Sequence, residues 1–342
     1  MRISVRAAVG AAGLAMTTAL ALAAPAIAPY APTTFFTDRA YAPPMGLHLR
    51  DARGWHGPFA YRQVLEDRLL RRYREDTTTR LPLWGTSRSA AQEPVLLLGA
   101  DALGRDLLSR TLYGARLSLG VTLAGACGAL LLGVIAGGLA GAAGGRTDGT
   151  LMLLADFVLA LPGVYLILVL RTLLPQVLSV GEVFWLMAGL FALAGWPHVA
   201  RGVRAIVATE RAREYAEAAR AAGAGPLRLL RHLLPAARGF LGVELVLLVP
   251  ALLVAEASIS FLGLGFPEQQ PSWGTMLRDA SNVNDMVLAP WTLAPAAALF
   301  IVVLCVQLVV GSRAGARATL GGGLAAGPEA VPGSAATATM TP

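Results

Sequence analysis

The stretch LSLGVTLAGACGALLLGVIAGGLAGAAGG, residues 117–145, decides the fold of this chain. It contains no charged side chain and lies between Arg116 and Arg146. A helix that crosses the hydrocarbon core of a bilayer needs about 20 mainly apolar residues. The stretch therefore predicts a transmembrane helix.

Five further apolar stretches lie outward from this one, at about residues 7–28, 150–170, 183–200, 239–262 and 286–311. The whole chain of 342 residues is 55% hydrophobic and 14% charged, whereas soluble domains carry about 25% charged residues. We therefore predict an all-α integral membrane protein with six transmembrane helices.

The first apolar stretch has two interpretations. Arg2 and Arg6 before it and the small residues around Pro25 are also typical of a secretory signal peptide. Its apolar part exceeds the roughly 7 to 15 residues of a signal-peptide core. We favour a retained anchor helix.

Arginines in the short loops indicate the orientation, because cytoplasmic loops carry an excess of basic residues. Segment 201–238 contains eight arginines and three glutamates, a net charge of +5, and is predicted to be cytoplasmic. With six spans, both termini are then cytoplasmic too, and they carry Arg2, Arg6, Arg313 and Arg317. The expected location is the cytoplasmic (inner) cell membrane, as a multi-pass protein.

This topology divides the chain into four parts. They are an N-terminal transmembrane anchor helix (1–30), an extracytoplasmic insertion with a pre-helix segment (31–112), a five-helix core with the cytoplasmic loop 201–238 (113–318), and a disordered cytoplasmic tail (319–342). Within the insertion, the run Val64–Arg74 is compatible with a helix.

The composition excludes several kinds of catalysis. All 28 basic residues are arginine, which excludes a Schiff-base lysine, a Ser-Lys pair and a P-loop. The four histidines lack metal-ligand spacing. We expect no catalytic residue, no cofactor or metal site and no nucleic-acid partner, so the chain is predicted to be noncatalytic.

Three acids, Asp156, Glu244 and Glu256, lie inside the expected spans. Such residues are costly in a membrane and are functional candidates. One alternative is a self-sufficient, ion-coupled secondary transporter that uses Asp156 and Glu256. The other, which we favour, is that each acid caps a helix, pairs with an arginine or bonds a neighbouring span. Asp156 and Glu256 thus remain candidates for the pathway or for helix packing.

The cytoplasmic loop has the pattern of two helices joined by a tight turn. Residues 203–222 contain no Gly or Pro and predict one helix that ends at Gly223. Pro226 is suited to begin a second helix, which Pro235 stops. Ala218 and Ala219 contribute small side chains beside Tyr215, so another protein can approach closely. The alternative is a solvated loop whose arginines reflect only the general excess of basic residues in cytoplasmic loops.

Glu217-Ala218-Ala219, then Gly223 and Leu234-Pro235, resemble the E-A-A loop of permease subunits in binding-protein-dependent ABC importers. Three other segments resemble the dipeptide, oligopeptide and nickel branch of that family, in particular the second of its two paired permeases. They are residues 98–119, Asp156 with Leu161-Pro162, and residues 255–265 with 271–277 and 289–291.

The resemblance implies a type I ABC importer permease fold and an importer of peptides (di- or oligopeptides) or related small solutes. It implies that ATPase subunits dock on the coupling loop at Tyr215, Glu217, Ala218, Ala219, Gly223, Pro226 and Pro235. The implied partners are a homologous second permease in a heterodimer, two ABC ATPases that bind ATP and Mg, an extracytoplasmic solute-binding protein and membrane lipid.

Overall fold

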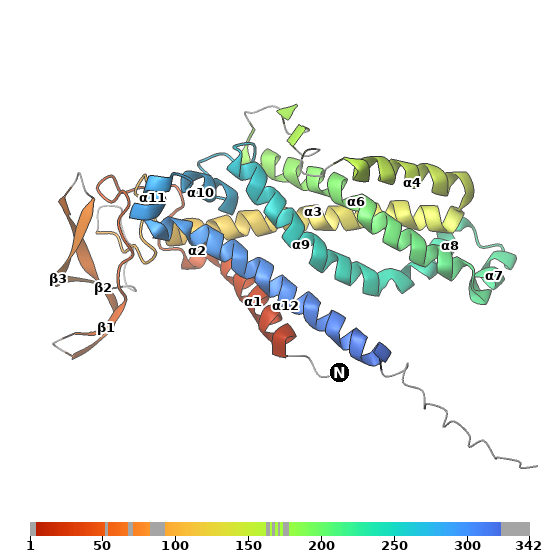
Figure 1. The fold of residues 1–342 in the computed structure, drawn as a ribbon, viewed down its shortest axis with the longest axis horizontal. Coiled ribbons are helices and arrows are strands. Elements are labelled where there is room, and N and C mark those ends of the chain that lie inside the picture. Colours follow the sequence, from red (N-terminus) through yellow and green to blue (C-terminus); the bar gives the residue numbers. More distant parts are fainter. Residues whose placement is uncertain are drawn as a thin grey trace, which may run out of the picture.

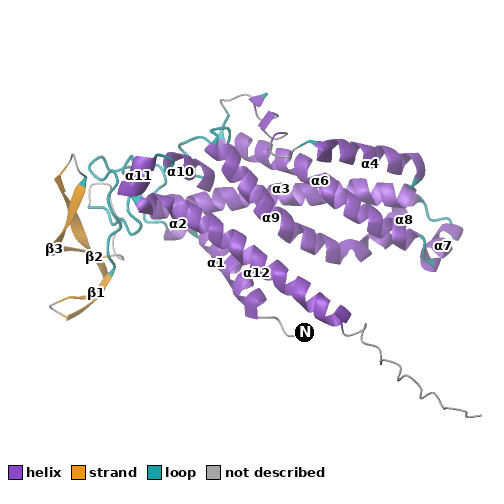
Figure 2. Ribbon diagram, viewed as in Figure 1, coloured by secondary structure: helices purple, strands orange, loops and turns teal. Residues whose placement is uncertain are grey.

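The computed structural model describes residues 5–51, 54–67, 71–82, 93–161, 165, 168–169, 172–173 and 178–322. Long helices form a bundle, and a small sheet lies at one end of it (Figure 1). Figure 2 shows that helix dominates the described chain. The expected all-α membrane fold is confirmed, with the sheet as an addition to it.

Within the described residues, five segments are long and apolar enough to cross a membrane. They are α1 (Val5–Leu22), α3 (Leu107–Ala143), α6 (Val180–Arg211), the segment Arg228–Phe261 that contains α9 (Arg238–Phe261), and the segment Pro290–Gly311 that contains most of α12 (Ala294–Gly322). The third expected span, about 150–170, begins within α4 (Gly145–Ala160), and much of its remainder lies outside the described residues.

The structure moves several expected boundaries. α3 begins at Leu107 rather than at 113, because the Asp106 side chain accepts a hydrogen bond from the Ser109 backbone N–H and caps the helix (2.9 Å). α12 continues to Gly322, beyond the expected limit of 318. The rest of the predicted tail, 323–342, lies outside the described residues.

α3 and α6 form the centre of the bundle and pack at very short range. A Cβ placed on Gly137 would lie 2.2 Å from the Ala200 carbonyl oxygen, and one on Gly133 would lie 2.3 Å from the Val199 Cβ. Small residues let membrane helices approach this closely. The large buried side chains of this core include Phe191.

α1 packs against α12 and α3, at the side of this core. Ala21, Ala115, Leu253, Trp273 and Val302 form a buried cluster that joins α1, α3, α9, α10 (Trp273–Asp279) and α12. Two short helices, α2 (Ala24–Ile27) and α11 (Val283–Leu288), and the 3-10 helix η2 (Pro290–Leu293) complete the end of the bundle beside the sheet.

The sheet lies within the insertion between α2 and α3. Strands β1 (His48–Asp51), β2 (Gly54–Asp67) and β3 (Arg72–Pro82) pair antiparallel in the order β1-β2-β3. The helix considered for Val64–Arg74 is therefore wrong. Val64 pairs with Arg74 across a hairpin, so cross-strand partners rather than helical neighbours organise this run.

A separate small core holds the insertion against the bundle. It contains Tyr30, Phe36, Met45 and Leu96. The Tyr30 backbone N–H donates to Ser109 Oγ on α3 (3.1 Å). The insertion is thus attached to the first turn of the central helix.

Candidate functional site

The basic segment 201–238 forms two short helices at the end of the bundle opposite the sheet (Figure 1). They are α7 (Glu214–Ala221) and α8 (Pro226–Leu233), and the 3-10 helix η1 (Leu234–Ala237) follows. The single helix predicted over 203–222 is wrong, because α6 ends at Arg211 and α7 begins afresh at Glu214. The second helix does begin at Pro226.

Glu210 bridges the break between α6 and α7. The Tyr215 hydroxyl donates to Glu210 Oε2 (2.8 Å), and Arg213 Nε lies 3.1 Å from the same oxygen. On the other side of α7, Ala216 is fully buried in the main core. Tertiary contacts therefore override the helix propensity of a stretch that has no breaker residue.

The turn between α7 and α8 depends on Gly223. This residue has φ +82°, a left-handed conformation that glycine adopts without strain. Its N–H donates to the Arg220 carbonyl (2.9 Å), and the Ala224 N–H donates to the Ala219 carbonyl (3.0 Å). This pair of bonds is a Schellman motif, which satisfies the last carbonyls of α7.

The two short helices are anchored to the ends of α3 and α6. Their inward side chains Ala216, Leu229 and Leu233 are buried in the main core. A Cβ on Gly138 of α3 would lie 2.9 Å from a Leu230 methyl group. A body that pushes on α7 and α8 therefore pushes directly on the central helices.

The outward face of the α7–α8 element carries small and charged side chains. Tyr215, Glu217, Ala218 and Pro235 are exposed, and Ala219 is half-buried against the core. Glu217 forms an ion pair with Arg220 (3.7 Å) and keeps 66% of its side chain exposed. Pro226 occupies the first position of α8. The predicted docking residues thus belong to one compact helix-turn-helix element.

Comparison with known proteins identifies the family. The profile of the binding-protein-dependent transport system inner membrane component family matches residues 129–312, which is more than half of the chain. The chain belongs to this permease family.

Similar curated relatives carry more specific names. An oligopeptide transport system permease protein of Haemophilus influenzae is 33% identical over 75% of both chains. One from Bacillus subtilis is 39% identical over 57% of this chain and 62% of its own length. A dipeptide transport system permease protein of Bacillus subtilis is 38% identical over 53% of this chain and 55% of its own.

The permease is thus a multi-pass membrane subunit of an ABC importer. Permeases of this family work with separate ATPase and substrate-binding proteins. The resemblance stated from the sequence is confirmed, and the comparisons give no support to an ion-coupled carrier.

The two candidate acids of the permease lie in different surroundings. Asp156 on α4 pairs with Arg201 on α6, and about half of each side chain is exposed. Glu256 on α9 is fully buried and accepts a hydrogen bond from the Ser260 hydroxyl (2.7 Å). The first contact joins two helices and the second lies within one helix; the structure does not bring Asp156 and Glu256 together.

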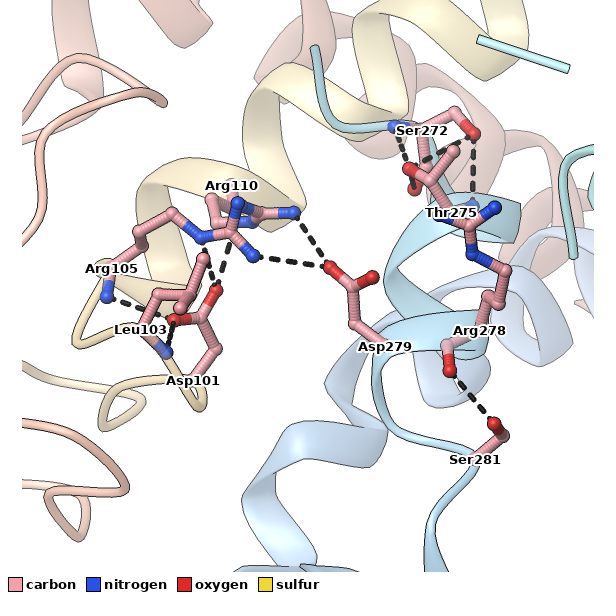
Figure 3. Close-up of polar contacts among 9 residues, drawn as sticks. All are labelled: Asp101, Leu103, Arg105, Arg110, Ser272, Thr275, Arg278, Asp279 and Ser281. Atoms are coloured by element: carbon pink, nitrogen blue, oxygen red, sulfur yellow. Dashed lines mark hydrogen bonds and ion pairs between the residues drawn. The ribbon is translucent and has the colours of Figure 1, made fainter. Parts of the chain in front are cut away.

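A buried ion cluster at the sheet end of the permease was missed from the sequence (Figure 3). Asp279 Oδ2 lies 3.1 Å from Arg105 Nη2 and 3.2 Å from Arg110 Nη2. Asp101 Oδ2 lies 2.6 Å from Arg105 Nε and 3.5 Å from Arg110 Nη1. The cluster joins the start of α3 to α10. Burial raises the pKa of the Asp279 carboxyl, and the two arginines oppose this rise.

A signal for this cluster was present in the sequence. Asp101, Arg105 and Arg110 all fall within the segment 98–119 that carries the family resemblance, and Asp279 lies two residues after the segment 271–277. The structure brings both segments together through Trp273, whose indole N–H donates to the Thr111 carbonyl (3.1 Å). The two segments lie more than 150 residues apart in the sequence, so their contact could not be predicted from the sequence alone.

Proposed function

We propose that this permease is the membrane subunit of an ATP-driven importer of di- or oligopeptides, and that an ATPase subunit docks on α7 and α8. ATP and Mg²⁺ are bound by the ATPase subunits. Closure of the ATPases pushes on the helix pair and switches the bundle between inward-open and outward-open states.

The anchored helix-turn-helix carries this proposal. Its exposed face holds Glu217 and Ala218, whereas its buried face packs on the ends of α3 and α6. An exposed element with small side chains and charges of both signs suits a protein partner. An element that merely connected two spans would not need its own buried anchor.

The proposed assembly contains this chain, a homologous second permease, two ATPases and an extracytoplasmic solute-binding protein. The proposed location is the inner cell membrane, with both termini cytoplasmic. Support for this orientation comes from the net +5 charge of segment 201–238 and from the position of α7 and α8 opposite the sheet.

Peptides are proposed as the substrate because the relatives are named for them. Oligopeptide and dipeptide transport permeases both occur among the similar proteins, at 32–39% identity. The name of a relative describes that relative, so peptide uptake by this chain needs its own test.

Two substitutions test the docking role. Glu217→Lys reverses a charge on the exposed face, and Gly223→Asp strains the turn that orients α7. We expect both variants to insert into the membrane normally. Each should lose about 1.4 kcal/mol or more of the free energy of ATPase binding, which lowers ATPase co-purification and peptide uptake by about tenfold or more. The measurements are pull-down of the tagged permease and uptake of a labelled dipeptide.

Glu66→Lys is the matched control, since it makes the same charge change on β2, at the other end of the molecule. It should leave both measurements unchanged. Normal uptake in both Glu217→Lys and Gly223→Asp would reject docking at this element.

A further inference from the structure

An apolar groove of about 340 Å³ lies between α1, α3, α9 and α12, four of the long helices in Figure 1. Its wall includes Leu14 and Leu22 of α1, Leu123 of α3 and Val302 of α12. Leu22 is 71% exposed and Leu123 is 51% exposed, so the groove opens on the side of the bundle. Its volume lies within the range of about 300–1,000 Å³ that is usual for small-molecule sites.

Among the described residues that line this groove, Arg116 of α3 is the only charged one. It is exposed, and it has no hydrogen bond or ion pair to any other residue in the described part of the chain. Its neighbours on α3 and before it differ, because Arg105 pairs with Asp101 and Arg110 pairs with Asp279. The guanidinium group of Arg116 is therefore available to an anion from outside the described chain.

The groove begins at the edge of the apolar stretch and runs along it. Arg116 directly precedes the charge-free residues 117–145, on the side of the sheet, where an arginine reaches the lipid headgroups. From Arg116 to Leu123 the groove follows α3 for about 10 Å, and from Leu22 to Leu14 it follows α1 for about 12 Å. One leaflet of the hydrocarbon core is about 15 Å deep. The groove thus extends from the headgroups across most of one leaflet.

This combination favours a lipid over other ligands. A free anion would meet Arg116 but leave the apolar length of the groove empty, whereas a purely apolar molecule would leave the arginine unmatched. The hydroxyl of Thr17, another lining residue, already donates to the Leu14 carbonyl within α1 (3.1 Å) and needs no ligand. Arginine binds phosphate through charge-assisted hydrogen bonds, and basic pockets between transmembrane helices bind phospholipid headgroups.

The charge of the lining also selects among phospholipids. It contains no carboxylate within the part of the chain that the structure describes, so the ammonium group of a zwitterionic headgroup would gain no partner beside Arg116. We infer that the groove binds one anionic phospholipid, with its phosphate on Arg116 and one acyl chain along the groove between α1 and α9. This site is independent of the proposed function, because it involves neither the ATPase-docking face nor the transported solute.

Photolabelling of the full-length permease in lipid nanodiscs tests the site. Two probes carry the same diazirine-bearing acyl chain and differ in headgroup, phosphatidylglycerol in one and phosphatidylcholine in the other. We expect the phosphatidylglycerol probe to label residues 119–123 and 245–249, and the phosphatidylcholine probe to label them at least about fivefold less. Mass spectrometry of the digested permease measures this. Equal labelling by both probes, in the parent protein, would overturn the proposal.

Arg116→Gln tests the headgroup contact and should lower labelling by the phosphatidylglycerol probe at least about fivefold. Arg146→Gln is the matched control. Arg146 follows the same charge-free stretch at its other end, is exposed, has no ion pair to a described residue and does not line the groove. This control should label as the parent does. Unchanged labelling in Arg116→Gln would overturn the proposed phosphate contact.

Thr18→Phe tests the acyl-chain contact, because Thr18 lines the groove and phenylalanine would fill part of it. Ala19→Phe adds the same ring at the next position of α1, which is exposed and does not line the groove. We expect labelling to fall at least about fivefold in Thr18→Phe alone. Equal labelling in both variants would overturn the proposal, and so would loss of labelling in the assembled transporter, which would assign the groove to the second permease.

Discussion

Gly137 lies at a very close contact between α3 and α6. Because a Cβ there would be 2.2 Å from the Ala200 carbonyl oxygen, Gly137→Ala must push the two helices apart. Overpacking of this kind costs about 2 kcal/mol, which lowers the melting temperature of a chain this size by about 3 °C. A thermal melt of the purified permease in detergent measures this.

Gly149→Ala is the matched control, since Gly149 is exposed on α4 and has no atom near the new methyl group. Alanine favours a helix by about 0.5–1 kcal/mol relative to glycine, so this variant should melt at the parent temperature or above. A melting temperature that drops equally in both variants would contradict the close contact at Gly137.

At the residue scale, the sequence could predict which side chains are unusual but not their partners. Asp156 and Glu256 stand out because they interrupt apolar runs. The partner of Asp156, Arg201, was counted only as part of a basic loop. Arg110 and Asp279 belong to segments far apart in sequence, and only the folded chain brings them to 3.2 Å.

At the scale of elements, the α7–α8 turn rests on the left-handed conformation of Gly223. Gly223→Ala places a side chain at φ +82° and costs about 1–2 kcal/mol. We expect the amides of Gly223 and Ala224 to exchange about five- to thirtyfold faster with deuterium, because their bonds close this turn. Hydrogen exchange with mass spectrometry reports this.

The neighbouring Gly225 offers a close comparison. It also has no atom within 4 Å of an added Cβ, but its φ is −71°, which alanine adopts freely. In the Gly225→Ala variant, the amides of Gly223 and Ala224 should therefore exchange with deuterium at the same rate as in the parent protein. Equal acceleration in both variants would mean that the backbone conformation of Gly223 does not hold the turn.

Element positions were predictable where one local signal dominates. Apolar runs located α1 and α9 to within six residues, and Pro226 marked the start of α8. By contrast, α3 begins 10 residues before the run 117–145, and α6 ends 11 residues after the run 183–200. The break before α7 was missed because it depends on the burial of Ala216 and on bonds to Glu210. The β2–β3 hairpin was missed because cross-strand pairing leaves little trace in a run that also fits a helix.

At the scale of the whole molecule, the positions of the sheet and of α7 at opposite ends make the orientation testable. In a variant with Cys127→Ser and Cys305→Ala, new cysteines replace Glu66 or Glu217. A membrane-impermeant maleimide should label Glu66→Cys in intact spheroplasts, but label Glu217→Cys only after permeabilisation. The reverse pattern would contradict cytoplasmic termini.

Helix α3 reaches from α8 at one end of the molecule to the buried ion cluster at the other. Its 37 residues span about 55 Å and include no proline. Gly138, near one end, lies against α8, and Arg110, near the other, holds the ion cluster. A force applied at α7 and α8 therefore travels along a single rod, and it reaches the ion cluster as a displacement of the helix rather than through a relay of loops.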